Sequence, residues 1–525
     1  MTNPIETRAS ADHTEGGQSR QKSFSAMALV MAFMLISKAL GFFREVALSA
    51  QFGMDEITDA YKTAFNIPCL LLSALIAAIA AVFIPVYNER RQAGEASERR
   101  FVGSLFSVGL FVSALIALGT WLMLPWLTRV MLPKATPEMV QLTIRLTGIM
   151  MPMALFVFLY RLLGAFLQAR FQFTMPAVAT CCSAVCVVAG ILMSRGNITI
   201  VAIWTLIGMG VEFLTQLPAA FRRGFRWKPA FDLGDPGLRQ IASLMLPLLI
   251  MGAFDQLYIV FDRVAASANA GDISALDYGN RITTMVSAAL LVTISTVLYP
   301  SLTQTAPNKN AFAEHFSFGV NLNLLIGLPA MSALLTLRVP VTRMVFERGA
   351  FDGSHTAITA GVLACYALGM IGIGLKELCN RAFWAQKSTR TPMFVGVGGV
   401  ILNIALDFPL YAWIGVSGVA LASAISAASC SAVLIFLLRA RVKRVGGKDI
   451  LICLIKSAAA TLAMTAALSL CVRLTGMTDL RGTKLIAALL GSIGIGLVSY
   501  VAFLSVLRTK ELSMIFAMVK RRRSK

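Results

Sequence analysis

Apolar runs of about twenty residues recur along nearly the whole chain, separated by short polar breaks. A helix of about that length is needed to cross a hydrocarbon core roughly 30 Å thick. Only 14% of the residues are charged, whereas about 25% are charged in an ordinary soluble domain. The sequence therefore predicts an all-α polytopic membrane protein without room for a large soluble domain.

Fourteen transmembrane helices are predicted. They cover residues 24–48, 58–87, 101–124, 140–167, 173–193, 198–221, 241–266, 275–302, 316–337, 356–384, 393–413, 416–438, 450–472 and 484–507. Residues 1–23 are polar and predict a disordered cytoplasmic tail, and residues 508–525 form a basic tail. Nine cysteines, most of them in apolar runs and without metal spacing, are interpreted as small core residues.

Two halves of the chain resemble each other at one offset. Pro85 ends the second helix as Pro300 ends the eighth, and the shift between these prolines is nearly the same as the shift from Phe166 to Phe383. The pattern predicts six-helix bundles over 24–221 and 241–438, joined by a cytoplasmic linker over 222–240, with two further helices in 439–507. Paired bundles of this kind are the frame of alternating-access transporters.

The formal charge of +21 lies mainly in the breaks and at the C-terminus. Cations are concentrated in the breaks that follow even-numbered helices, namely Arg90, Arg91, Arg99, Arg100, Arg222, Arg223, Arg226, Lys228, Arg439, Arg441, Lys443, Arg444 and Lys448. The positive-inside rule then places both termini in the cytoplasm. This distribution favours contact with anionic lipid over nucleic acid. The break over 338–355, with three arginines, goes against the rule.

Ionisable residues within the first helix are candidates for a binding site, because a charge in a span is costly. Ser37, Gly41 and Arg44 share one face, and Lys38 and Glu45 lie beside them. Two interpretations remain open for Arg44. It can bind an anion in a wet cavity, or it can form a structural ion pair with a carboxylate on a neighbouring helix.

Other charged or polar groups lie in the second half. Arg281, near the start of the eighth helix, could join Arg44 in holding a phosphate, whose geometry the guanidinium fork suits. Asp262, with Asn403 and Asp407 four residues apart, could hold Na⁺, or they could form a polar cluster without an ion. The chain contains neither a GxxxxGK[ST] loop nor a GxSxG elbow, so the sequence predicts neither an ATP motor nor an enzyme, and no cofactor.

Several motifs resemble those of the MurJ (MviN) lipid II flippases, members of the multidrug/oligosaccharidyl-lipid/polysaccharide (MOP) exporter superfamily. The resemblance rests on the segments 37–45, 52–53, 59–61, 83–87, 348–351 and 380–403, in this order. The second helix departs from many members, having Leu72 and Ser73 where they have an arginine pair. The family fold has two six-helix bundles, and its last two helices form a groove thought to hold the polyprenyl tail.

The resemblance also implies roles for individual residues. Arg44, Arg281 and Lys38 match cationic positions of the substrate cavity, together with the polar face of Ser37 and Gly41. Glu45 and Asp59 match acidic positions near the outward gate. A sodium site described in some members corresponds to Asp262, Asn403, Asp407, Val419 (through its carbonyl) and Ser423.

The predicted function is outward flipping of lipid II, the undecaprenyl-diphosphate-linked peptidoglycan precursor, in the inner membrane of a bacterium. Expected partners are lipid II, membrane lipids and other proteins of cell wall synthesis. The main alternative is a MOP exporter of another polyprenyl-linked saccharide or of drugs. An enzyme acting on polyprenyl lipids would need an acidic or His cluster at a membrane face, and a silent scaffold would leave the intramembrane charges without a purpose.

Overall fold

The structure is a computed structural model that describes residues 32–33, 35–232, 234–442 and 447–507, except for some side chains of the second and tenth helices. The described residues form helices joined by turns and short loops, without a strand, which confirms the predicted all-helical class. The tails predicted over 1–23 and 508–525 lie outside the described residues.

Helices of the first half begin with one that covers residues 35–52. It is followed by α2 (Glu56–Gln92), α3 (Glu95–Leu122), α4 (Leu124–Met131), α5 (Pro137–Met150), α6 (Met153–Ala169), α7 (Thr174–Met193), α8 (Ile198–Leu214) and α9 (Leu217–Arg222).

Helices of the second half begin with α10 (Pro236–Ala266), α11 (Asp272–Ser287), a π-helical turn (Ala288–Val292) and α12 (Thr293–Thr305). Then come α13 (Lys309–Thr336), α14 (Arg338–Phe346), α15 (Gly353–Ala385), α16 (Arg390–Ile414), α17 (Val416–Val442), α18 (Gly447–Thr475) and α19 (Gly482–Val506).

Ten helices among the described residues are long and apolar enough to span a membrane, and the bent pair α5 and α6 could supply an eleventh span. The chain is therefore a multi-pass membrane protein. Helices α2 and α10 cover two of the other predicted spans, and the described part of the first helix covers 35–48 of the predicted span 24–48, so the structure is consistent with fourteen spans.

Three predicted segments differ from the structure in detail. The fourth predicted span, 140–167, is broken between α5 and α6, with a bend of 44°. Pro152 lies at the break, and proline there removes a helical hydrogen bond. The sixth predicted span is divided into α8 and α9, and the break over 338–355 contains the short helix α14.

The described residues form two compact units. Unit 1 comprises residues up to Gln51 together with Ala60–Arg129 and Pro137–Ala253. Unit 2 comprises Phe52–Asp59, Val130–Thr136 and the chain from Phe254 onward. Two short segments of the first half thus belong to the second unit. The bundle boundaries predicted from the sequence remain predictions.

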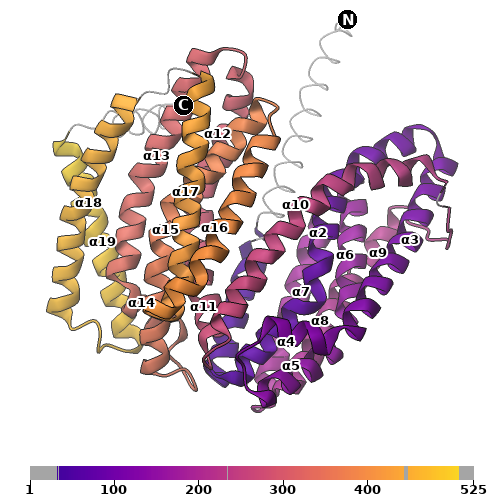
Figure 1. Ribbon diagram of the computed structural model, residues 1–525, viewed down its shortest axis with the longest axis horizontal. Coiled ribbons are helices and arrows are strands. Elements are labelled where there is room, and N and C mark those ends of the chain that lie inside the picture. The colour runs from indigo at the N-terminus through magenta and orange to yellow at the C-terminus, as the bar shows by residue number, and fades with distance from the viewer. Residues whose placement is uncertain (1–31, 34, 233, 443–446, 508–525) are drawn as a thin grey trace, which may run out of the picture. The chain divides into compact units, whose positions relative to one another are not determined.

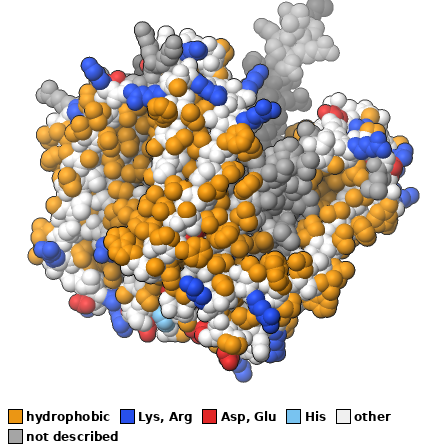
Figure 2. Space-filling view, viewed as in Figure 1, with side chains coloured by type: hydrophobic (Ala, Val, Ile, Leu, Met, Phe, Trp, Pro, Cys, Tyr) orange, Lys and Arg blue, Asp and Glu red, His pale blue; other side chains and the backbone are white. Residues whose placement is uncertain are grey.

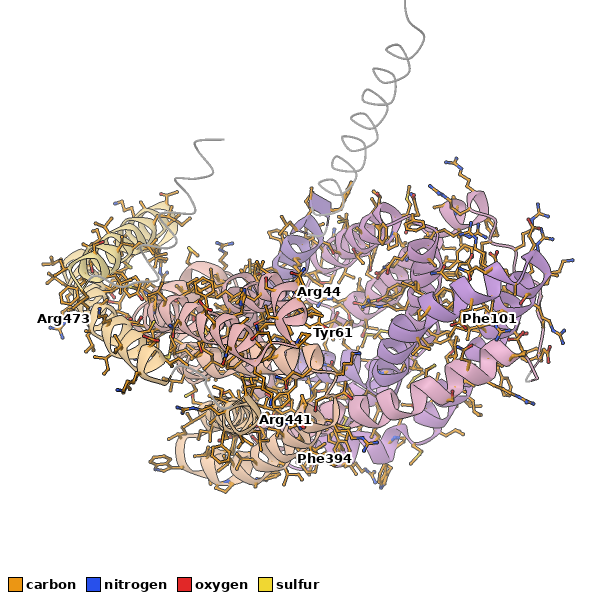
Figure 3. The ribbon with its side chains drawn as sticks, turned by 90° about the horizontal axis from the view of Figure 1, so that it is seen from above. Arg44, Tyr61, Phe101, Phe394, Arg441 and Arg473 are labelled. Carbon is orange, nitrogen blue, oxygen red and sulfur yellow. The ribbon has the colours of Figure 1, made fainter. Side chains whose placement is uncertain are left out.

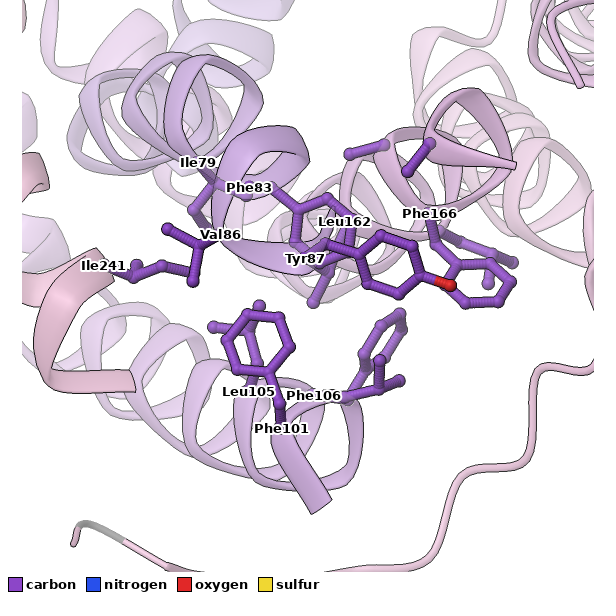
Figure 4. Close-up of a cluster of buried hydrophobic side chains, with 14 of the residues drawn as sticks. Ile79, Phe83, Val86, Tyr87, Phe101, Leu105, Phe106, Leu162, Phe166 and Ile241 are labelled. Atoms are coloured by element: carbon purple, nitrogen blue, oxygen red, sulfur yellow. The ribbon is translucent and has the colours of Figure 1, made fainter. Parts of the chain in front are cut away.

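The core of unit 1 contains a cluster of aromatic side chains (Figure 4). The Phe83 and Tyr87 rings stack with their centroids 5.4 Å apart, and the Tyr87 and Phe166 rings meet edge to face at 5.6 Å. The Tyr87 hydroxyl donates to Glu98 at 2.6 Å, and Arg170 donates to both Tyr87 and Glu98. An ion pair tied to a tyrosine thus closes one end of this core.

In unit 2, α18 and α19 lie beside α13 (Figure 1). The Tyr500 hydroxyl of α19 donates to the carbonyl of Leu325 at 2.7 Å, and the Ser332 and Thr465 hydroxyls are 2.5 Å apart. Such hydrogen bonds hold neighbouring helices together where the contacting surfaces of both helices are otherwise apolar. In Figure 2, hydrophobic side chains cover the middle of the unit 2 helices, while most Lys and Arg side chains lie near the helix ends.

Candidate functional site

The first helix carries a compact cluster of charges within unit 1. Arg44 Nη2 lies 2.7 Å from Glu45 Oε1, and the two side chains are 24% and 14% exposed. The Arg44 guanidinium also lies over the Phe65 ring, 5.4 Å from its centroid. Figure 3 labels Arg44. Arg44 therefore forms an ion pair, as one of the two interpretations of the sequence expected. Its carboxylate, however, comes from the next residue rather than from a neighbouring helix.

Lys62 of α2 is a second cation in this cluster, which the sequence analysis missed. Its Nζ lies 4.0 Å from Glu45 Oε2, and its side chain is 5% exposed. Arg44, Lys62 and Glu45 together carry one net positive charge if all are ionised. A lysine within an apolar helix was the available signal, because a buried charge needs a partner.

The other predicted residues of the first helix lie on the same segment. Ser37 and Gly41 are half-buried, as is Arg44, and Lys38 is exposed. Nearby, the buried Tyr61 hydroxyl of α2 lies 2.8 Å from the Thr205 hydroxyl of α8. The face predicted from the spacing is thus a partly accessible one.

Arg281 lies on α11 in unit 2 and is exposed. Within the described part of the chain, no carboxylate forms an ion pair with it. Asp277, one turn earlier, is paired instead with Arg263 of α10, at 3.4 Å. Asn280, next to Arg281, accepts a hydrogen bond from the Thr284 hydroxyl at 2.8 Å.

Asp59 caps the start of α11. Its Oδ2 accepts from the Gly271 amide at 2.8 Å, and its Oδ1 accepts from the Ser274 amide at 2.7 Å and the Ser274 hydroxyl at 2.5 Å. The side chain is only 1% exposed. Because the first N–H groups of a helix have no partner within it, a carboxylate there is strongly stabilised.

Glycines allow the segment Phe52–Asp59 to pack closely on the rest of unit 2. A Cβ at Gly53 would lie 2.7 Å from the carbonyl oxygen of Ala350, and Gly53 has φ of +69°. A Cβ at Gly271 would lie 2.6 Å from the carbonyl oxygen of Met54. Motifs that carry the family resemblance and lie far apart in the sequence therefore meet here.

A buried polar cluster joins α10 and α16 in unit 2. The Asn403 amide nitrogen donates to Asp262 Oδ1 at 3.1 Å and to the two oxygens of Asp407 at 3.1 and 3.0 Å. Asp262 is 8% exposed, and Asn403 and Asp407 are fully buried. The structure therefore brings together the three residues predicted from the sequence.

The cluster extends to α17. The Ser423 hydroxyl donates to the carbonyl of Val419 at 3.3 Å and lies 2.6 Å from the hydroxyl of Tyr258, one turn before Asp262. The Asn403 amide oxygen is buried and has no hydrogen-bond partner among the described residues. Two carboxylates and a hydroxyl are oxygen ligands that suit a hard cation such as Na⁺, but the Asn403 side chain turns its amide nitrogen, not its oxygen, toward the carboxylates. The sequence analysis missed Tyr258.

Comparison with known proteins identifies the family. The family model described as "Lipid II flippase MurJ" matches residues 48–485, most of the chain. The chain belongs to this family.

Curated relatives cover similar stretches. A protein of Burkholderia cenocepacia named "Lipid II flippase MurJ" is 26% identical over 437 residues, covering 80% of this chain and 84% of the relative. One of Rickettsia prowazekii, named "Probable lipid II flippase MurJ", is 26% identical over 410 residues, covering 76% and 80%.

Solved structures share the fold. "Lipid II flippase MurJ, inward closed conformation" has a TM-score of 0.77 at 24% identity, covering 91% of this chain and 98% of that one. An inward-facing multidrug resistance MATE family transporter of the MOP superfamily has a TM-score of 0.64 at 11% identity, covering 80% and 98%. The fold is therefore that of the MOP superfamily, as the resemblance implied.

Proposed function

We propose that this protein is a lipid II flippase, which moves the undecaprenyl-diphosphate-linked peptidoglycan precursor from the cytoplasmic to the outer leaflet by alternating access. Family membership over residues 48–485 supports this proposal, as do curated relatives that carry this name. The protein acts as a transporter, and it performs no chemical reaction on the lipid.

The observation that carries the proposal is the cluster of Arg44, Lys62 and Glu45. Two cations from different helices, Arg44 and Lys62, lie beside Glu45 within an apolar part of the chain. Arg44 is also partly accessible. A diphosphate could bind at this accessible guanidinium, whose fork can donate two parallel hydrogen bonds.

Arg281 is proposed as a second ligand of the diphosphate. It is exposed, and the nearby Asp277 is engaged with Arg263, so its charge is available to a substrate anion. Lys38, Ser37 and Gly41 would line the path of the polar head. By the resemblance to the family, α18 and α19 would keep the polyprenyl tail in lipid.

Sodium is proposed as the coupling ion, bound by oxygens of Asp262, Asn403, Asp407, Val419 and Ser423. For this, the Asn403 side chain must present its oxygen to the ion, and two buried carboxylates would then gain a cation. Glu45 and Asp59 are proposed to act at the outward gate. Asp59 would release the start of α11 when that gate opens.

The proposed location is the inner membrane of a bacterium, with both termini in the cytoplasm. Lipid II and membrane lipids are the direct partners, and other cell wall synthesis proteins would consume the flipped precursor. Labelling of single cysteines tests the orientation. A cysteine in place of Ala270, an exposed residue of the 267–274 break, should react with an impermeant reagent from outside intact cells, and labelling only from the cytoplasmic side would overturn the orientation.

Reconstituted vesicles test the function. Purified protein is inserted with a fluorescent lipid II analogue, and an impermeant quencher reports which leaflet holds the head group. Arg44→Ala, Arg44→Lys, Arg281→Ala and Arg281→Lys should each reduce flipping per folded molecule at least tenfold. Arg390→Ala, which removes an exposed arginine at the start of α16, is the matched control and should flip normally.

A purely structural role for Arg44 has a different signature. Removing it would leave Glu45 with less compensation and lower the amount of folded protein, and Arg44→Ala with Glu45→Ala would restore both folding and flipping. In the binding role, the double variant folds but does not flip. Full flipping by Arg44→Ala alone would exclude Arg44 from binding.

The alternative is export of another polyprenyl-linked saccharide or of a drug, supported by the shared MATE fold. The same vesicles distinguish the two. Movement of a polyprenyl diphosphate saccharide without a peptide, but not of lipid II, would favour the alternative.

A further inference from the structure

A cavity of about 320 Å³ lies at one end of unit 2, where three helix ends meet. These are the junction of α12 with α13, the end of α15 and the end of α17. Its lining consists of Ala306, Lys309, Phe312, Gln386, Arg441 and Val442. Each of these three helix ends closes an even-numbered predicted span. The proposed orientation therefore places the cavity at the cytoplasmic face.

Arg441 is held in place by neutral groups. Its Nη1 donates to the Ser388 hydroxyl and its Nη2 to the Thr391 hydroxyl, each at 3.0 Å. The guanidinium also lies over the Phe383 ring, 5.2 Å from the centroid. Figure 3 labels Arg441. Its geometry is therefore fixed, while its charge is not neutralised by these partners.

Lys309, the first residue of α13, brings a second cation to the same cavity. Across the described stretches of the chain, neither Lys309 nor Arg441 has an ion pair with a carboxylate. Both cations are exposed, so the cavity opens to water and their charges are accessible to an anion. The cavity is thus suited to a compact anion.

The internal repeat shows how this cavity arises. The turns after α6 and α15 have the same form, with positive φ at Phe171 (59°) and Lys387 (58°), and they are related by the offset of the repeat. The residue before each turn is Arg170 in unit 1 and Gln386 in unit 2.

The change from Arg170 to Gln386 removes a cation that is paired in unit 1. In unit 1, Arg170 and Glu98 form an ion pair that closes this corner. In unit 2, the neutral Gln386 cannot form that pair, and the cavity with its two cations lies there instead.

We propose that this cavity binds a phosphate ester. Guanidinium and ammonium groups donate to phosphate oxygens, and the Gln386 amide adds a neutral donor. Phe312, Ala306 and Val442 offer apolar contact to the ester carbons. The volume suits a phosphate with a glycerol-sized group and is far too small for a sugar-peptide head. Binding here is independent of which substrate the protein transports.

The phosphate could belong to an anionic phospholipid head group or to a soluble ester. Binding to the purified full-length protein in detergent is measured by native mass spectrometry, with phosphatidylglycerol against phosphatidylcholine as one arm. Glycerol 3-phosphate and inorganic phosphate form the second arm. Saturable binding in the first arm alone identifies a lipid head group, and binding in the second identifies a soluble phosphate.

Variants locate the bound phosphate. Arg441→Gln and Lys309→Gln should each weaken binding at least tenfold. Ala306→Leu keeps both charges but fills the cavity, and it should weaken binding as much. Arg439→Gln removes an exposed arginine of α17 that does not line the cavity, so it should change binding less than twofold.

Three results would overturn the proposal. They are the absence of binding in both arms, full binding by folded Ala306→Leu, and an equal loss in Arg439→Gln and Arg441→Gln. The last result would show that surface charge alone attracts the anion. Thermal unfolding of each variant identifies those that fold. If Lys309→Gln does not fold, Lys309→Ala takes its place.

Discussion

Removing the Asp59 carboxylate should loosen the start of α11 specifically. Asp59→Ala leaves two amides and one hydroxyl without their acceptor, at a site where the side chain is 1% exposed. Each buried unsatisfied donor costs about 1–3 kcal/mol, and loss of a helix N-cap typically costs about 1 kcal/mol. Water can enter the space left by the carboxylate, so we expect a total of about 2–4 kcal/mol.

Hydrogen exchange measures this effect directly. If local opening limits exchange, the amides of Gly271 and Ser274 should exchange about 30-fold to 1,000-fold faster, at 1.36 kcal/mol per factor of ten. Asp352→Ala is the control, because Asp352 caps α15 in the same way but its side chain is 65% exposed. Its local opening should become easier by about 1 kcal/mol or less.

Unchanged exchange at Gly271 and Ser274 in folded Asp59→Ala would refute this reasoning. The hydrogen bonds would then contribute nothing to the stability of the helix start. Equal acceleration over the whole of unit 2 would also contradict it, since the predicted effect is local.

Three further predictions concern other parts of unit 2. Raising sodium to about 100 times its dissociation constant should stabilise the protein by about 2.7 kcal/mol relative to potassium, and Asp407→Asn should abolish this difference in thermal unfolding. Burial opposes ionisation of Glu347, but hydrogen bonds from Arg343 and Thr356 outweigh it and hold its pKa below the ordinary value. The stabilisation that the ionised Glu347 provides is fully present above about pH 4.3 and is lost as the pH falls through the lower pKa of the folded protein. Glu347→Gln should therefore make the melting temperature depend less on pH in that acid range. Gly53→Ala should destabilise the protein by about 1–3 kcal/mol because of its φ of +69° and the nearby carbonyl of Ala350, whereas Gly476→Ala, with a φ of +56° but open space, should cost less in chemical unfolding.

Local patterns predicted the helices well, because the length and apolarity of a run report its environment directly. The predicted limits of the span over 173–193 differ from α7 by a single residue. The break at Pro152 was harder to predict, since a proline in a membrane helix is tolerated when neighbouring groups replace the lost bond. The helix α14 was missed because it is short and lies in a polar break.

The candidate residues were found by charge, but their partners were not. Asn403 and Asp407 are one helical turn apart, so their proximity followed from the sequence. The contact of Asn403 with Asp262, far earlier in the chain, required the packing of α10 against α16. Lys62 was overlooked because only its burial beside Glu45 distinguishes it from the lysines near the membrane surface.

The sequence by itself determined that this chain crosses a membrane many times as helices, that its halves repeat, and that it resembles the lipid II flippases. Only the tertiary structure decided that Glu45 serves both Arg44 and Lys62, and that Asp59 caps a helix from the other half of the sequence. The physical reason is that lipid and protein interiors are equally apolar. Hydropathy reports burial from water but not the neighbour, and the neighbour is selected by packing and hydrogen bonds between distant helices.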